Sequence, residues 1–394
     1  MHDTPRPARA GWLWRLGVLL VAVALTATAG TAAARSVVPG EQLSISESGC
    51  GAPMAQLPAG SVTFNVTDHA VAFATVYVVS PAGLVYAEIN SLTPGKTLLL
   101  STTLAAGTYA IRCVFSDNTV RTSSLIVVTG TTTGAVAGYL PLPDLDMQGP
   151  VTEYSAWVSS QLPHLLADST TLDNDIASGN LTAAKADWLT AHLDYERLGV
   201  AYNSFGDFDD EINGMAKGLP DGTATPGWTG FFAIEYALWH GESAARIRPL
   251  TKNLVSTING LIQDFPSEEI DPGDLPLRSH EILENGLQFQ LTGIADYGSG
   301  TTLATLYANT QGTQEVLRVL TPLIQPRDPG LLAAINQDMT TVQADLDSAR
   351  TPGGTWTPLG QLSTVQRQQL DGDLGTLLED LSVIPNLLAP RTFA

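Results

Sequence analysis

The hydrophobic pattern of this 394-residue chain changes its period near residue 130. Between residues 43 and 129, short runs rich in Val, Thr, Ile and Tyr alternate with turn signals such as Pro-Ala-Gly and Pro-Gly. Runs spaced about 8–15 residues apart, without helical periodicity, are typical of strands in a small β-sandwich. We therefore expect an all-β domain over 43–129. Its predicted strands are SVTFNV, FATVYVV, LVYAEI, TLLLSTTL, TYAIRCVF and SSLIVV.

The stretch over residues 130–149 is rich in Thr, Gly and Pro, which predicts a linker. Beyond it, apolar residues recur at i, i+3, i+4 and i+7. This spacing places the apolar residues on one face of each helix, so residues 150–394 are predicted to form an all-α bundle. The chain is thus expected to be multidomain. The predicted helical segments are 151–178, 181–202, 229–240, 247–265, 276–293, 301–324, 330–350 and 363–388.

The N-terminal segment, residues 1–34, has the three parts of a secretory signal. A positively charged region with Arg6, Arg9 and Arg15 comes first, and an apolar run from Leu16 to about Ala29 follows it. The small residues of a cleavage site come next, at Ala32-Ala33-Ala34. The run is roughly 14 residues long, short of the ~20 that span a bilayer. We expect export to the periplasm, the cell envelope or the medium. Cleavage would leave no stable membrane anchor, since no Cys stands at the cleavage site for lipid attachment.

The chain is strongly acidic, with 39 acidic and 19 basic residues and a formal charge of −20. Such a surface repels nucleic acid and anionic lipid and attracts cations. Binding to nucleic acid is therefore not expected.

The two cysteines, Cys50 and Cys113, are predicted to form one disulfide in an oxidising compartment. A blue-copper site needs a free Cys, two His and usually Met close together. Cys113 has neither His nor Met nearby, and His69 is the single His between residues 43 and 129. Copper binding is therefore not expected.

Three helical segments contain residues that can bind a metal inside a bundle. His192 and Glu196 stand at i and i+4, so they share one helix face, and His280 and Glu284 repeat this spacing. Glu235 lies in the apolar run FFAIEYALW, where a charge needs a partner or a metal. The alternative for each pair is an ordinary surface contact.

The acidic segment 205–214, FGDFDDEING, resembles a calcium loop only superficially. Counted from Asp207 as the first position of such a loop, the sixth position is Ile212 instead of Gly, and the twelfth is Gly218 instead of Glu. We expect a connecting loop in which Asp207 is a candidate secondary ligand of a metal site, with Asp209 as the other choice. The chain also lacks H-E-x-x-H, G-x-S-x-G, Walker and dinucleotide-binding motifs.

Several stretches together resemble the EfeO family of extracytoplasmic iron-uptake components. The resemblance covers most of 150–345 and is weaker over 43–129. The matching stretches are AHLDYERLG at 191–199, FGDFDDEING at 205–214, GFFAIEYALW at 230–239, SHEILENGLQFQLTG at 279–293 and DYGSG at 296–300.

The resemblance implies a cupredoxin-like N-terminal domain and an imelysin-like helical domain that binds Fe²⁺ or Fe³⁺ through an H-x-x-E motif. It also implies delivery of iron to a membrane permease. In this chain the motif keeps its Glu at Glu235 but has Phe232 in place of His. Because an apolar ring cannot bind a metal, the chain is expected either to bind iron with its other candidates or to be an envelope interaction module with a degenerate site. Peptidase activity is not expected, because a zinc hydrolase needs a full ligand set and a general base.

Overall fold

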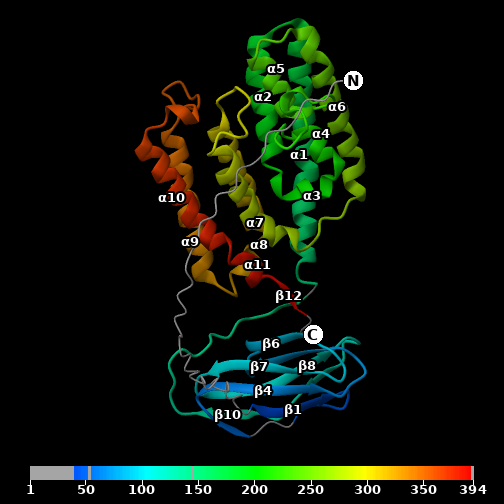
Figure 1. Cartoon of the computed structure of the whole chain (residues 1–394), viewed down its shortest axis with the longest axis vertical. Coiled ribbons are helices and arrows are strands. Elements are labelled where there is room, and N and C mark those ends of the chain that lie inside the picture. The colour runs from blue at the N-terminus through cyan, green and yellow to red at the C-terminus, as the bar shows by residue number, and fades with distance from the viewer. Residues whose placement is uncertain (1–39, 52–54, 144, 392–394) are drawn as a thin grey trace, which may run out of the picture. The chain divides into compact units, whose positions relative to one another are not determined.

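The computed structural model describes residues 40–51, 55–143 and 145–391. The predicted signal segment, residues 1–34, lies outside the described residues. Within them a β-rich region precedes a helical region (Figure 1). The fold class predicted from the change of period is therefore confirmed. The cupredoxin-like assignment and the domain bounds stay predictions.

The β-region consists of two sheets packed around one core. One sheet has the strand order β2-β1-β4-β7, and the other has the order β3-β10-β8-β5-β6, with β9 paired to β8. Inward side chains such as Phe64, Val66 and Ile111 alternate with outward ones, as expected for a sandwich. Each of the six predicted runs overlaps a strand, although only the second half of SSLIVV lies in one. The bounds are β1 Glu41–Ser46, β2 Gly49–Cys50, β3 Gln56–Pro58, β4 Gly60–Asp68, β5 Ala74–Val79, β6 Val85–Leu92, β7 Thr97–Leu104, β8 Gly107–Phe115, β9 Val120–Thr122 and β10 Ile126–Thr129.

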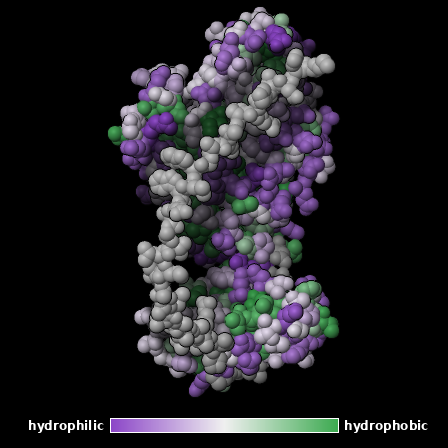
Figure 2. All heavy atoms as spheres, viewed as in Figure 1, coloured by the Kyte–Doolittle hydropathy of each residue, from purple (hydrophilic) through white to green (hydrophobic). Residues whose placement is uncertain are grey.

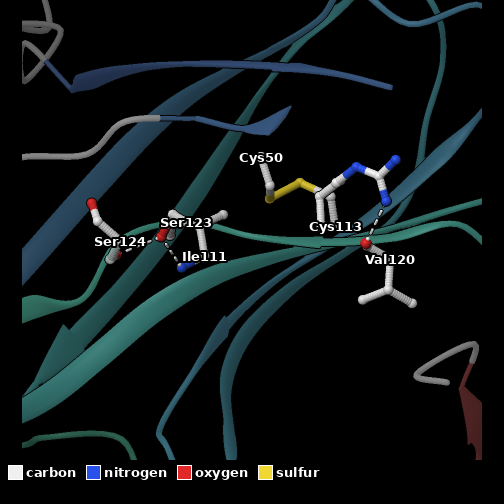
Figure 3. The surroundings of a disulfide bond; sticks show 7 residues. Cys50, Ile111, Cys113, Val120, Ser123 and Ser124 are labelled. Carbon is white, nitrogen blue, oxygen red and sulfur yellow. Dashed lines mark hydrogen bonds between the residues drawn. A yellow bond between two sulfur atoms is a disulfide. The ribbon is translucent and has the colours of Figure 1, made fainter. Parts of the chain in front are cut away.

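A disulfide joins the two sheets. Cys50 of β2 and Cys113 of β8 are both buried and bonded to each other (Figure 3). The two residues are 63 positions apart in the chain. Closing a loop of this length removes chain entropy from the unfolded state equivalent to roughly 4 kcal/mol.

The helical region has its own core, separate from that of the sandwich. Helix α1 packs on α2 and α6, and α9 packs on α10. Each of the eight predicted helical segments contains a helix. The bounds are α1 Gln148–Ser178, α2 Leu181–Glu196, α3 Tyr202–Phe205, α4 Asp207–Asn213, α5 Gly230–Trp239, α6 Ala244–Asp264, α7 Asp274–Asn285, α8 Thr302–Ile324, α9 Pro329–Ser348, α10 Thr364–Leu381 and α11 Ile384–Leu387.

Two local features differ from the sequence-based expectation. The acidic segment 205–214 is helical over α4, where Asp207, Asp209 and Asp210 lie in the first turn. Acidic side chains there interact favourably with the positive end of the helix dipole, which explains a helix where a loop was expected. In addition, the segment after α7 winds as a π-helix, η4, over Gly286–Gln290.

The predicted linker is fastened to the helical region. Arg327, just beyond α8, donates hydrogen bonds to the backbone oxygens of Leu140 and Pro141 at 3.1 and 2.9 Å. Strand β11, Leu142–Pro143, pairs in parallel with β12, Pro390–Arg391, near the C-terminus. The chain between the two cores is therefore held by several hydrogen bonds.

The visible face of the helical region is mostly hydrophilic, while hydrophobic atoms gather on the sandwich over β6 and β7 (Figure 2). On β7, Leu98 and Leu99 are exposed. Among the helices that the structure describes, we find none with the length and apolar character needed to cross a membrane.

Two pairs of neighbouring helices, α1/α2 and α9/α10, bring aspartates together. Each of these four helices carries two aspartates seven residues apart, which therefore lie on the same face of the helix. Burial, and then the facing carboxylate, raise the pKa of Asp187 and of Asp345 to about 6. The facing residues are Asp175 with Asp187, Asp168 with Asp194, Asp338 with Asp380, and Asp345 with Asp373.

We predict that Asp345 makes the protein less stable as pH rises from about 4 to above 6. Its pKa is higher in the folded state than its ordinary 3.8, so the folded state binds the proton more tightly, and this stabilisation is lost as pH rises through about 6. The Asp345→Asn variant should lose less unfolding free energy over this range in urea titrations. The exposed Asp371→Asn is the control, and equal pH profiles for all three proteins would contradict the prediction.

Candidate functional site

The buried carboxylate of Glu196 is held by three side chains from three helices. Asn213 of α4 donates its Nδ2–H to Oε1 at 2.9 Å, and Asn309 of α8 donates to Oε2 at 2.9 Å. His192, one turn earlier on α2, places Nε2 3.0 Å from Oε1. Burial alone would raise the pKa of Glu196, but His192 and the two amides together lower it below its ordinary value. Glu196 is therefore a buried, charged carboxylate with a hydrogen bond to each oxygen.

His192 belongs to this network and is enclosed by aromatic rings. Its Nε2 also lies 3.1 Å from Oδ1 of Asn213, so both neighbouring acceptors place a proton on that nitrogen. The rings of Trp188, Phe231 and Phe232 lie 4.9–5.3 Å from the imidazole, centroid to centroid. Its Nδ1 is buried without a hydrogen-bond partner among the described residues. A metal could reach neither nitrogen without rearrangement.

A cavity of about 160 Å³ opens beside this network. Two carboxylates, several amides and apolar side chains share its wall. They come from α2, α3, α4, α5, α7, η4, α8 and the intervening loops. The lining residues are Glu196, Tyr202, Asp209, Asn213, Met215, Phe232, Ile282, Asn285, Gly286, Phe289, Gln290, Ala295 and Asn309.

Helix α4 divides its acidic residues between two sides. Asp209 and Asn213, four positions apart, both line this cavity, whereas Asp207 and Glu211 line a different cavity of about 350 Å³. Residues two apart on a helix do not share a face, which separates Asp207 from Asp209. Asp209 accepts a 2.6 Å hydrogen bond from the Tyr195 hydroxyl, and burial raises the pKa of its carboxyl to about 6.

Glu235 faces a backbone loop. Its Oε1 accepts hydrogen bonds from the N–H groups of Tyr297 and Ser299 at 3.0 and 2.9 Å. Its Oε2 is buried and, in the part of the chain that the structure describes, makes no hydrogen bond. Burial raises the pKa of Glu235 to about 7, against the lowering effect of Ser299. Glu235 therefore anchors the 296–300 turn that precedes α8.

Phe232 lies between the Glu196 network and the loop that Glu235 contacts. Its ring lies 5.3 Å from the ring of His192 and 5.3 Å from that of Tyr297, and it is buried. Gly230 starts this helix with φ +82°, in close approach to the backbone of Ile212. The tight start fixes where Phe232 and Glu235 point.

His280 and Glu284 lie apart from this cavity. Their closest atoms, Nδ1 and Oε2, are 3.6 Å apart, and neither residue lines the cavity, although α7 supplies Ile282 and Asn285 to it. The structure thus brings Glu196 and His192 into direct contact and leaves Asp207, Glu235 and the His280/Glu284 pair outside that contact. Across the described ranges, no three His, Cys, Asp or Glu side chains are grouped closely enough to bind a metal.

The sequence-based list of candidates omitted the two asparagines and Tyr195. The spacing of Asp209 and Asn213 on a helix is a signal that could have found one of them, once α4 is known to be helical. Asn309 stands 113 positions from Glu196, and no local pattern links the two residues.

The helical region matches a known family. The sequence model of the Peptidase M75 family, described as imelysin, matches residues 150–382. The chain belongs to the imelysin family. The predicted resemblance to the EfeO family is confirmed as well.

Similar proteins include the "Iron uptake system component EfeO" of Escherichia coli K12, 24% identical over 95% of this chain and 98% of that protein. The protein of the same name from Shigella flexneri is similar to the same extent. A crystal structure from Parabacteroides distasonis, described as an iron-regulated protein A precursor, aligns with a TM-score of 0.46 and 14% identity. That alignment covers 65% of this chain and 97% of the other.

We predict that Asn309→Leu destabilises the imelysin region by about 2–3 kcal/mol, because it leaves one oxygen of a buried, charged Glu196 without its donor. Urea unfolding measures the loss. The same substitution in a Glu196→Gln background should cost less than half as much, since no charge is then left unpaired. Equal losses in the two backgrounds would show that Asn309 acts only through packing.

Proposed function

We propose that this member of the imelysin family is an extracytoplasmic component of an iron-uptake system that binds iron in the cavity beside Glu196 and Asp209. The names of the similar E. coli and Shigella proteins support the iron-uptake role. The observation that carries the proposal is the cavity itself, where a fixed, ionised carboxylate and a second acidic side chain face one space. Carboxylate and amide oxygens suit iron and manganese better than Cu(I).

The charge of the whole chain supports this proposal. A formal charge of −20 raises the local concentration of cations around the protein. The two carboxylates then add a local attraction inside the cavity. Iron is cargo in this scheme, so the site must release it as well as bind it.

Export and delivery to a permease complete the proposal. The predicted signal at residues 1–34 would place the protein outside the cytoplasm, where it collects iron for a membrane permease. The mature chain would meet the permease through its own surface.

The role of Asp209 is tested by a matched pair of variants. Asp209→Asn should weaken Fe²⁺ binding at least tenfold in anaerobic calorimetry, because it removes a charge from the cavity wall. Asp207→Asn removes the same charge from the same helix but outside this cavity, and should leave the affinity nearly unchanged. Equal effects of the two substitutions would place iron elsewhere.

Phe232 favours a second candidate function, an envelope interaction module with a degenerate metal site. It replaces the His of the motif, and its ring occupies the space between His192 and Tyr297. On this alternative the helical region would recognise a peptide or protein partner without iron.

Elemental analysis after iron loading separates the two functions, with Phe232→His beside the wild type. The iron-binding proposal predicts close to one iron per wild-type chain and at most a modest gain in the variant. A wild type without iron, together with a variant that gains one equivalent, would support the degenerate site.

We do not propose peptidase activity, despite the family's title. A zinc hydrolase needs several protein ligands, an open coordination position and a general base. With Phe232 in the motif and Glu235 bonded to two backbone N–H groups, the residues present do not assemble such a centre.

A further inference from the structure

One wall of the cavity carries an amide side chain, that of Gln290, which makes no hydrogen bond within the described residues. Gln290, the last residue of the π-helix η4, is 8% exposed and lines the cavity. Its side chain makes no hydrogen bond to any residue that the structure describes. Its amide atoms are not fully enclosed by protein, so they reach the space of the cavity, where a ligand or water can bond to them. π-helices occur mostly as single turns at functional sites, since they turn side chains out of the regular helical spacing.

Two further residues, Asn285 and Asp209, offer hydrogen-bond acceptors to the cavity. Asn285, directly before η4, is exposed at the cavity and also has a side chain without a hydrogen bond inside the described part of the chain. Asp209 has one carboxylate oxygen bonded to Tyr195. The cavity thus presents several oxygen acceptors from different helices.

These acceptors do not form a direct coordination sphere. Iron in oxygen-rich sites takes about six ligands in an octahedron. Oε1 of Glu196 already accepts hydrogen bonds from His192 and Asn213, and Oε2 accepts one from Asn309, so Oε2 alone keeps a position for one further weak contact. The described residues also lack a group of three acidic, His or Cys ligands.

The size of the cavity suits an ion that keeps its water. Its 160 Å³ is room for several water molecules, since one water needs only ~10–15 Å³ by the same measure. A bare ion would leave most of this space empty. Small divalent cations give up their waters reluctantly and often stay partly hydrated in proteins.

We propose that the cavity binds a divalent cation together with its water shell, so that Gln290, Asp209 and Glu196 recognise the coordinated waters and not the metal. Water bound to a metal directs its lone pairs at the ion and its hydrogens outward, so it needs acceptors. Carboxylate and amide oxygens supply them. This inference rests on the proposed function and specifies the form in which the iron is held.

Outer-shell binding has consequences for delivery. The metal–water bonds stay intact, so binding and release require only hydrogen bonds to form and break. Release to a permease is then fast, and cations with similar shells, such as Mn²⁺ and Mg²⁺, compete.

Hexaamminecobalt(III) tests the proposal, because its ammonia ligands do not exchange and it presents N–H donors in the geometry of a hydrated ion. In anaerobic calorimetry on the mature chain, it should displace Fe²⁺ from the wild type. Gln290→Met, which keeps the side-chain volume, should lower the affinity for both ions at least tenfold. Gln288→Met, on the exposed side of η4, is the matched control and should change neither affinity.

Other outcomes would overturn it in distinguishable ways. If Fe²⁺ binds but hexaamminecobalt(III) does not displace it, the metal is coordinated directly, and only the outer-shell inference fails. If hexaamminecobalt(III) binds Asp209→Asn as tightly as the wild type, its binding reflects overall charge and the inference fails again. If a ferric hydroxamate binds and Fe²⁺ does not, the cavity takes an organic chelate. If no iron species binds, the proposed function fails as well.

Discussion

The candidate site depends on one buried charge, the carboxylate of Glu196. An ionised carboxylate in a protein interior is stable only if donors replace the water that it loses. Asn213, Asn309 and His192 supply these donors at 2.9–3.0 Å. Since the donors come from α2, α4 and α8, satisfying one charge fixes the relative positions of three helices. The same contacts fix part of the cavity wall, because Asn213 and Asn309 also line the cavity.

Much of the fold could be predicted because the apolar residues that become buried recur along the sequence with the period of a strand or a helix. The strands from β4 to β8 and the long helices were found in this way, and so was the His192/Glu196 pair, whose contact follows from four-residue spacing on one helix. The partners of that pair could not be found so. Asn309 is 113 positions away, and its role depends on how α8 packs. The same holds for Asp209, which turns toward the cavity only because α4 is helical.

Glu235 shows why a motif residue need not act as the motif suggests. Phe232 stands where the motif has His, and the carboxylate accepts hydrogen bonds from two backbone N–H groups of the 296–300 turn. One of its oxygens remains buried without a partner among the described residues. Burial then shifts its pKa to about 7, a value at which the group is partly protonated near neutral pH. In this structure the two backbone hydrogen bonds make Glu235 a structural anchor of the turn.

These observations divide the acidic groups of the region by what surrounds them. Glu196 is ionised and hydrogen-bonded on both oxygens, Glu235 is bonded to backbone, and Asp209 lines the cavity with a pKa of about 6. Gln290 adds an acceptor that costs no charge repulsion against these carboxylates. A site built in this way attracts cations without enclosing one in a tight shell of direct ligands. On the function proposed above, retention through water would let the protein release iron to another protein without breaking metal–ligand bonds.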